Sequence, residues 1–340
     1  MLKDVKPPRL IATWKEADYE VWLYKWAATT KAKFSLPQVV TSFVPYLYNR
    51  TDHLQTQTTG TLYTFHLINR LTNEVVALFH AVTDEKSHLM WSPPMAPFGG
   101  IQCAELIPKS TLTFLLDCLY KWALSQRINT ITFKTAPAVY QPQQHQVLHQ
   151  AYKKAGYVPI EQHTSHHISV SDRSFTELIS GAERRRLRKG QRAGFVARLW
   201  HKPDPEVVYT FINKSRQEQG YPLTLPREKL LDLLNLFPAE VLVFGVYDGE
   251  IIAALTVAIQ VSRDIIYNFL PADNLQYRTY SPTVMLNEAL YHYCQQEGVK
   301  IVDLGISLDH HGQPKPSLAR FKERLGGISS PKITYSKELR

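Results

Sequence analysis

Residues 119–133 read LYKWALSQRINTITF, and residues 290–304 read LYHYCQQEGVKIVDL. The two stretches align without a gap. Tyr120 aligns with Tyr291 and Ile131 with Val302, so both pairs are 171 residues apart (291 − 120 and 302 − 131), close to half of the 340 residues. Because an internal repeat changes how every local motif is read, it has to be settled first. We infer that the chain contains two copies of one fold.

The segments around these stretches repeat in the same order. The turn at Asn73 precedes an apolar run, as the turn at Asp248-Gly249 does. Ser110 precedes the first helical pattern, and Ser281 precedes the second. Residues 152–156 resemble residues 321–326, one residue out of phase. A hairpin, a helix, a strand and a second helix that match in one order would be a rare coincidence, so we expect the duplication to span both halves.

The second half has the clearer pattern. An Asp-Gly pair between two apolar runs predicts a hairpin, and Ser281 followed by Pro282 predicts the start of a helix. The expected helices are 205–219, 226–236, 282–296 and 316–325, and the expected strands are 241–246, 251–259, 265–269, 301–304 and 333–335. The first half ends alike, with strand 131–133, helix 144–155 and strand 167–170. We therefore predict an α/β fold with a mixed sheet (α+β) in two domains, 1–170 and 171–340.

Composition limits the function more loosely. Lys and Arg total 39 against 30 Asp and Glu, and the net charge of +9 favours polyanionic partners such as nucleic acid or phosphorylated substrates. No stretch is long and apolar enough to span a membrane, and the first residues lack the apolar core of a signal peptide. The three scattered cysteines, Cys103, Cys118 and Cys294, form neither a disulfide framework nor a metal spacing. These features predict a cytoplasmic protein.

The predicted order of elements resembles the GNAT acyltransferase fold, and its duplication resembles the Fem-like and BioF2-like branch of that superfamily, which has two such domains in tandem. Four motifs carry the resemblance. They are the basic run ERRRLRKGQRAG at 183–194, the helix start YSPTVML at 280–286, VDLG at 302–305 and RFKERLGG at 320–327. Together they cover the C-terminal half well, and the first half only through the repeat.

The resemblance implies transfer of an acyl or aminoacyl group to a small-molecule or peptide amine, with acyl-CoA as co-substrate or aminoacyl-tRNA in its place. It implies that residues 171–340 bind the donor and that residues 1–170 are a degenerate copy on the acceptor side. Ordinary GNAT enzymes wrap the coenzyme A pyrophosphate in a glycine-rich loop, but residues 274–281 contain no glycine. A helix that starts at Ser281, Pro282 and Thr283 can still bind phosphate, and the Fem-like use of aminoacyl-tRNA makes the missing glycines less surprising.

Three residues of the second half are candidates for catalysis. Lys322 follows Phe321, and in Fem-like enzymes the equivalent pair reaches the donor site; the alternative is a surface lysine. Asp303 interrupts an apolar strand, as either a partnered structural group or a base for the amine. Tyr267 is a candidate acid for the leaving group, although aromatic residues at such spacings are more often part of a core.

The remaining candidates concern binding. Arg185, Arg188 and Arg192 share one helix face, which suits a phosphate-bearing ligand or is only a solvated surface. Phe98, Gly99 and Gly100 end the first copy's fourth strand, where they either admit the acceptor or form a plain turn. No metal-ligand spacing is present. The rival to an enzyme is a non-catalytic GNAT-like module whose basic face holds a phosphate-rich ligand or nucleic acid.

Overall fold

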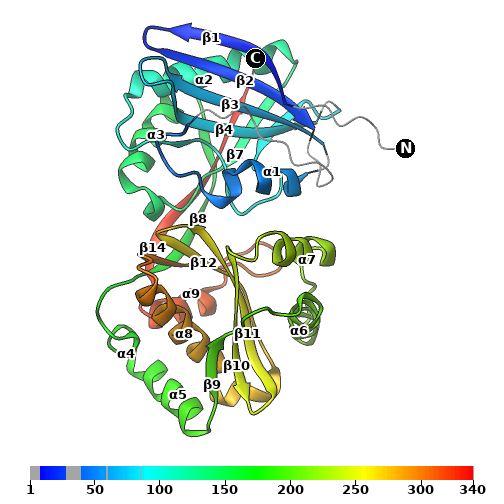
Figure 1. Cartoon of the computed structure of the whole chain (residues 1–340), viewed down its shortest axis with the longest axis vertical. Helices are drawn as coiled ribbons and strands as arrows, with labels where there is room; N and C mark the ends of the chain where they lie inside the picture. Colours follow the sequence, from blue (N-terminus) through cyan, green and yellow to red (C-terminus); the bar gives the residue numbers. More distant parts are fainter. Residues whose placement is uncertain (1–7, 28–39, 59, 85, 340) are drawn as a thin grey trace. The chain divides into compact units, whose positions relative to one another are not determined.

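The computed structural model describes residues 8–27, 40–58, 60–84 and 86–339. The chain divides into two compact units (Figure 1). Unit 1 consists of residues 1–163 and 331–340, and unit 2 of residues 164–330. The division falls a few residues before the expected junction, and the last ten residues return to unit 1. None of the described helices is both long and apolar enough to cross a membrane.

Unit 1 is a twisted sheet with helices packed against it. Its strands are β1 (Arg9–Glu16), β2 (Tyr19–Ala27), β3 (Thr61–Asn69), β4 (Glu74–Asp84), β5 (Leu89–Ser92), β7 (Thr130–Lys134) and part of β14 (Ile328–Glu338), in that spatial order, with the short β6 (Gln102–Cys103) beside β4. Its helices include α1 (Thr51–Gln57), α2 (Lys109–Ser125) and α3 (Pro142–Lys154). All neighbouring strands along this order are antiparallel except β5 and β7, which are parallel.

Unit 2 repeats this plan. Its strands follow the order β9 (Val196–Leu199), β10 (Val241–Asp248), β11 (Ile251–Ser262), β12 (Ile265–Asp273), β13 (Ile301–Ile306) and part of β8 (Val158–Ser169). The helices are α4 (Phe175–Leu178), α5 (Gly181–Arg192), α6 (Pro205–Glu218), α7 (Arg227–Leu236), α8 (Pro282–Gln296) and α9 (Pro316–Arg324). Figure 1 shows α6 and α7 on one side of β10 and β11, and α5 and α8 on the other. The predicted mixed α/β fold is confirmed.

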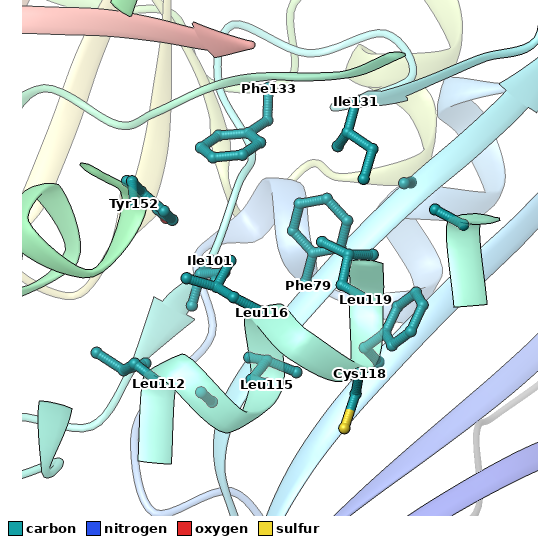
Figure 2. Close-up of a cluster of buried hydrophobic side chains, with 14 of the residues drawn as sticks. Phe79, Ile101, Leu112, Leu115, Leu116, Cys118, Leu119, Ile131, Phe133 and Tyr152 are labelled. Atoms are coloured by element: carbon teal, nitrogen blue, oxygen red, sulfur yellow. The ribbon is translucent and has the colours of Figure 1, made fainter. Parts of the chain in front are cut away.

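The core of unit 1 lies between α2 and the sheet. Helix α2 buries residues at helical spacing, among them Leu112, Leu115, Leu116 and Leu119. Figure 2 shows these side chains packed with Phe79 and Ile131 of the sheet. Helix α8 of unit 2 buries the corresponding stripe, including Leu286, Leu290 and Tyr291, against β10–β13. Each copy therefore has a core of its own.

Strand register confirms the duplication. Ile131 pairs with Met90 across the parallel β5–β7 ladder, and Val302 pairs with Ile266 across the parallel β12–β13 ladder. In both units the helix between the two strands carries the aligned tyrosine, Tyr120 on α2 and Tyr291 on α8. The two aligned pairs thus occupy the same topological positions.

The last strand of each copy completes the sheet of the other unit. The strand beside β13 is the end of β8, where Ile301 pairs with Ser169. The strand beside β7 is β14, where Lys134 pairs with Thr334. Residues 167–170 and 333–335 were predicted as strands of the first and second domain, and their strands β8 and β14 pair with a strand of the other unit. A strand's hydrophobic pattern fixes which face is buried but not which neighbour it joins.

Candidate functional site

The strands β12 and β13 form a fork in unit 2. They pair only from Ile265 and Ile301 to Tyr267 and Asp303, while β12 continues to Asp273 and β13 to Ile306. The two strands therefore splay apart after these residues. Beyond Tyr267, the edge of β12 that faced β13 has no strand partner there, so main-chain groups become available to a ligand.

A cleft of about 420 Å³ occupies the fork. Residues of β12, β13, α8 and α9 line it, together with the segments 219–224 and 308–310. The residues used below are Tyr267, Asn268, Thr283, Asn287, Gly305, Phe321 and Lys322. Four of the predicted site residues, Tyr267, Thr283, Phe321 and Lys322, therefore come together from distant parts of the sequence.

Lys322 is a buried lysine rather than a surface one. Its ammonium group donates to the carbonyl oxygens of Gly305 (2.9 Å) and Ile306 (2.7 Å), and the residue is only 7% exposed. Burial lowers the pKa of Lys322 to about 8, and the charge of Asp303 acts in the opposite direction. An ammonium has three N–H donors, so one remains besides these two bonds, and Lys322 is among the residues that line the cleft.

Asp303 holds the end of β13 in place. One carboxylate oxygen accepts hydrogen bonds from the backbone N–H of Gly305 (2.7 Å) and the hydroxyl of Ser165 (3.2 Å). The pairing of β13 with β8 shifts register between Asp303 and Gly305, so these bonds fix a bulge. Asp303 is buried and is not among the residues that line the cleft. This environment favours the alternative of a partnered structural group.

Tyr267 lines the cleft next to this bulge. Burial raises the pKa of its phenol well above the usual value, and the nearby charge of Asp303 raises it further. The phenol is therefore protonated at neutral pH. A protonated phenol at this place can donate a proton or a hydrogen bond to a bound group.

A chain of uncharged polar side chains forms part of the cleft wall. The Thr256 hydroxyl donates to the side-chain oxygen of Asn268 (2.6 Å). The side-chain amide of Asn268 donates to the side-chain oxygen of Asn287 (3.2 Å). The side-chain amide of Asn287 donates to the backbone oxygen of Thr283 (2.7 Å). These side chains come from β11, β12 and α8. We call Thr256, Asn268 and Asn287 the amide ladder.

The first turn of α8 differs in part from the prediction. Pro282 is at the first helical position, as expected, and Thr283 lines the cleft. Ser281 has a left-handed backbone (φ 51°), and its side chain does not cap the helix. The predicted Ser281 cap is wrong because a capping side chain requires an extended backbone at that position. Neither Ser281 nor Pro282 lines the cleft.

The basic helix α5 lies beside this turn. It buries Leu187 and Gly190, and a β carbon at Gly190 would be 2.6 Å from the sulfur of Met285 on α8. Lys189 donates to the carbonyl oxygen of Thr279 (2.8 Å) and lies over the Tyr280 ring. The glycine thus permits close packing of α5 against α8.

The outer face of α5 carries arginines that bind nothing in the described part of the chain. The guanidinium groups of Arg185, Arg188 and Arg192 are exposed, and within residues 86–339 no hydrogen bond or ion pair holds them. Arg186, by contrast, pairs with the buried Glu183. The three predicted arginines do share an exposed face, but none of them lines the cleft.

Phe98, Gly99 and Gly100 belong to the packing of unit 1. Phe98 is 2% exposed, within an aromatic cluster with Tyr46 and Tyr48. Gly99 donates to the Lys134 carbonyl oxygen, and Gly100 to the Ser92 hydroxyl. At this end of β7 the cavity measures about 40 Å³. These contacts favour the turn alternative over an acceptor site, and the cleft at the fork of unit 2, at about 420 Å³, is larger than the cavity at this end of β7.

Several residues near Lys322 were missed from the sequence. Ser165 and His166 lie on the end of β8, which pattern analysis assigned to the other copy. Burial and the charge of Lys322 lower the pKa of His166, while Glu323 raises it. The sequence held one indication of Asn268 and Asn287: each is an amide among apolar residues, Asn268 within a strand and Asn287 on a helix face. Among the residues that the structure describes, no group of three or more His, Cys, Asp or Glu could hold a metal.

Comparison with known proteins identifies the fold. No family model matches the chain, and no curated protein matches its sequence. The crystal structure of FemX superimposes with a TM-score of 0.60 at 14% identity, over 81% of this chain and 87% of FemX. A tandem GNAT protein from the clavulanic acid biosynthesis pathway superimposes with a TM-score of 0.51 at 12% identity, over 82% of this chain and 83% of that protein. A conserved protein of unknown function from Bacteroides thetaiotaomicron VPI-5482 superimposes with a TM-score of 0.50 at 10% identity, over 82% of this chain and 83% of that protein.

These likenesses define the class of fold. The chain consists of two tandem GNAT-like domains, in an architecture that it shares with FemX. Identities of 10–14% establish the architecture and not the reaction. The chemistry has to be argued from the fork and its side chains.

Proposed function

We propose that unit 2 transfers an acyl or aminoacyl group from an activated donor, acyl-CoA or aminoacyl-tRNA, to an amine. The observation that carries this proposal is the fork, a cleft of about 420 Å³ in which a buried ammonium group and a protonated phenol face the same space. Such a reaction needs a held donor, a polarised carbonyl and a proton path, and it needs no covalent intermediate on the protein.

The residues have separate roles in this mechanism. The third N–H of Lys322 and the unpaired edge of β12 stabilise the negative charge that develops on the carbonyl oxygen. The amine nitrogen forms a bond to the carbonyl carbon, and the bond from that carbon to the donor's sulfur or oxygen breaks. Tyr267 gives its proton to the leaving atom and regains one from the nitrogen. Asp303 acts as a positioning residue because it holds the bulge at Gly305.

The donor's phosphates are assigned to the start of α8 and the face of α5. Thr283 lines the cleft in the first turn of α8, where the positive end of the helix dipole suits an anion, although no glycine loop precedes it. The guanidinium groups of Arg185, Arg188 and Arg192, which have no partner among the described residues, suit a ligand with several phosphates. This second feature also supports the alternative function, a non-catalytic module that holds nucleic acid or another phosphate-rich ligand.

Donor binding and turnover separate the two functions. The full chain is mixed with acetyl-CoA, longer acyl-CoAs or aminoacyl-tRNA, binding is followed by thermal shift, and transfer to an amine panel is followed by mass spectrometry. An enzyme should lose turnover in Lys322→Ala and keep it in Lys153→Ala, since Lys153 is exposed on α3. Binding of tRNA without transfer from any donor would instead establish the binding module.

A further inference from the structure

The internal duplication provides a control for the amide ladder. Asn287 lies 171 residues after Leu116, at the same place on the helix (287 − 116). In the sheets, Ile259 pairs with Tyr267 and Val82 pairs with Trp91, which is the residue equivalent to Tyr267. Ile259 and Val82 are therefore equivalent. Thr256 and Phe79 each lie three residues before them and are equivalent too. Unit 1 thus has Phe79 and Leu116 where unit 2 has Thr256 and Asn287.

Unit 1 shows that this fold does not need polar groups at these positions. Figure 2 shows Phe79 and Leu116 within the hydrophobic cluster, together with Leu112, the counterpart of Thr283 (283 − 112 = 171). Both Phe79 and Leu116 are 1% exposed. Burying polar groups in place of apolar ones does not add stability unless every hydrogen bond is satisfied. The ladder is therefore not explained by the packing of the fold.

The ladder retains hydrogen-bonding capacity toward the cleft. Asn268 and Asn287 are 7% and 5% exposed, and both line the cleft. In the described contacts, the Asn268 amide nitrogen uses one of its two N–H groups, and the Asn287 oxygen accepts one bond although it can accept two. The Thr256 hydroxyl holds the Asn268 carbonyl, which keeps the amide of Asn268 directed at its partner.

We propose that Asn268 and Asn287 determine which group is transferred. The cleft accepts an acyl or aminoacyl group that bears an uncharged hydrogen-bonding group, such as a hydroxyl or an amide, in preference to its alkyl counterpart. The ladder contains no charge, so it matches a neutral group. A site that is built to hydrogen-bond its ligand rejects the analogue without that group, because its buried polar atoms are then left unpaired. This inference rests on the transferase function proposed above.

Matched donor pairs test the inference with the full chain. The pairs are butyryl-CoA with 3-hydroxybutyryl-CoA, and alanyl-tRNA with seryl-tRNA. Dissociation constants are measured by calorimetry for the first pair and by filter binding for the second. We expect the hydroxylated member of at least one pair to bind about tenfold more tightly or better, which corresponds to one hydrogen bond in a buried site. The two pairs also distinguish the two classes of donor.

Variants taken from unit 1 locate the origin of the preference. Asn287→Leu, and the double change Asn268→Ser with Asn287→Leu, install the residues found at Leu116 and Ser92. Circular dichroism and thermal unfolding show whether the variants fold. The comparison of the donor pairs with the wild-type protein does not depend on the variants. Folded variants should bind both members of the pair equally.

The outcomes separate this inference from the proposed function. Binding of all four donors with equal affinity within each pair overturns the ladder's role and leaves the transferase intact. A preference that survives in the folded variants also overturns it. If no donor binds and none is used, the transferase function fails, and the inference fails with it.

Discussion

The ring of Tyr267 lies directly over Gly305, and a β carbon at Gly305 would be 3.0 Å from Cε2 and 3.2 Å from the hydroxyl oxygen of that ring. Gly305 also has a positive φ of 71° and donates to Asp303 from its backbone. Its carbonyl oxygen accepts from Lys322. One glycine therefore connects the three residues that we predicted for catalysis.

Gly305→Ala should lower both stability and turnover. The added methyl group strains a left-handed backbone and pushes Tyr267 out of place, which we expect to cost about 1–3 kcal/mol of unfolding free energy. Denaturant unfolding and transfer assays measure the two effects. Gly249→Ala is the matched control, because Gly249 has a φ of 58° and no atom within 4 Å of the new carbon. Equal losses in the two variants would mean that the contact with Tyr267 has no importance.

Lys322→Met should reduce transfer about a hundredfold at pH 7, the usual effect of removing one group that stabilises an oxyanion. The ammonium is the active form, so the ratio of wild-type to variant rate should fall as the pH rises through about 8, the pKa of Lys322. Taking the ratio cancels the titration of the acceptor amine. Lys153→Met serves as the control and should match wild type. A ratio that is constant from pH 6 to pH 10 would contradict this role.

The stability of the protein should show the same titration with a definite sign. The pKa of Lys322 is about 8 in the folded chain against an ordinary value of 10.5, so the unfolded chain binds more protons between these values. The contribution of Lys322 to the free energy of unfolding therefore rises as the pH increases from about 8 to about 10. Urea unfolding of wild type and Lys322→Met across this range gives the difference. A difference that shrinks with pH would refute the lowered pKa.

The triple change of Arg185, Arg188 and Arg192 to Ala should weaken binding of tRNA without affecting the fold. If each arginine neutralises one phosphate, the slope of log K against log salt should decrease in magnitude by about 2–3. Filter binding at several salt concentrations measures the slope. Arg186→Ala is the control, because Arg186 is paired with Glu183. An unchanged slope would show that the arginines are only a solvated face.

Leu116→Ala should cost about 2–5 kcal/mol of unfolding free energy, since it leaves a cavity in the cluster of Figure 2. Leu124→Ala on the same helix should cost well under half as much, because Leu124 is 38% exposed. Thermal or denaturant unfolding compares the two variants. Similar costs would place Leu116 outside the core that anchors α2.

Local patterns predicted much of this molecule. The repeat identified α2 with α8 and β7 with β13, because the alternation of apolar residues is strong in both copies. The prediction placed Pro282 at the first position of α8 and the end of the helix at residue 296, two residues before Gly298, where φ is 69°. These features depend on a few neighbouring residues, and short-range sterics decide them.

Pairing over long distances could not be predicted in the same way. Nothing in the pattern of residues 165–169 specifies β13 as their neighbour. For that reason Ser165 and His166 were missed, although they lie beside Asp303 and Lys322. The burial of Lys322 was equally hidden, since Lys322 and Lys153 stand near the ends of similar helices, and only the fold distinguishes them. Gly156 and Gly326 end the two helices, and aligning these glycines gives an offset of 170 (326 − 156). With this offset the counterpart of Lys322 is the buried Tyr152 (322 − 152) and not Lys153.

The exchange of final strands makes the two copies inseparable in a practical sense. A chain cut after residue 170 would give two fragments, each holding a strand that the other needs, at β7 and at β13. Their folding would become a bimolecular reaction, with a midpoint that depends on protein concentration. In the intact chain the two parts are covalently linked, so their association is intramolecular and does not depend on protein concentration. Both strand exchanges thus take place within one polypeptide, and they need no encounter between molecules.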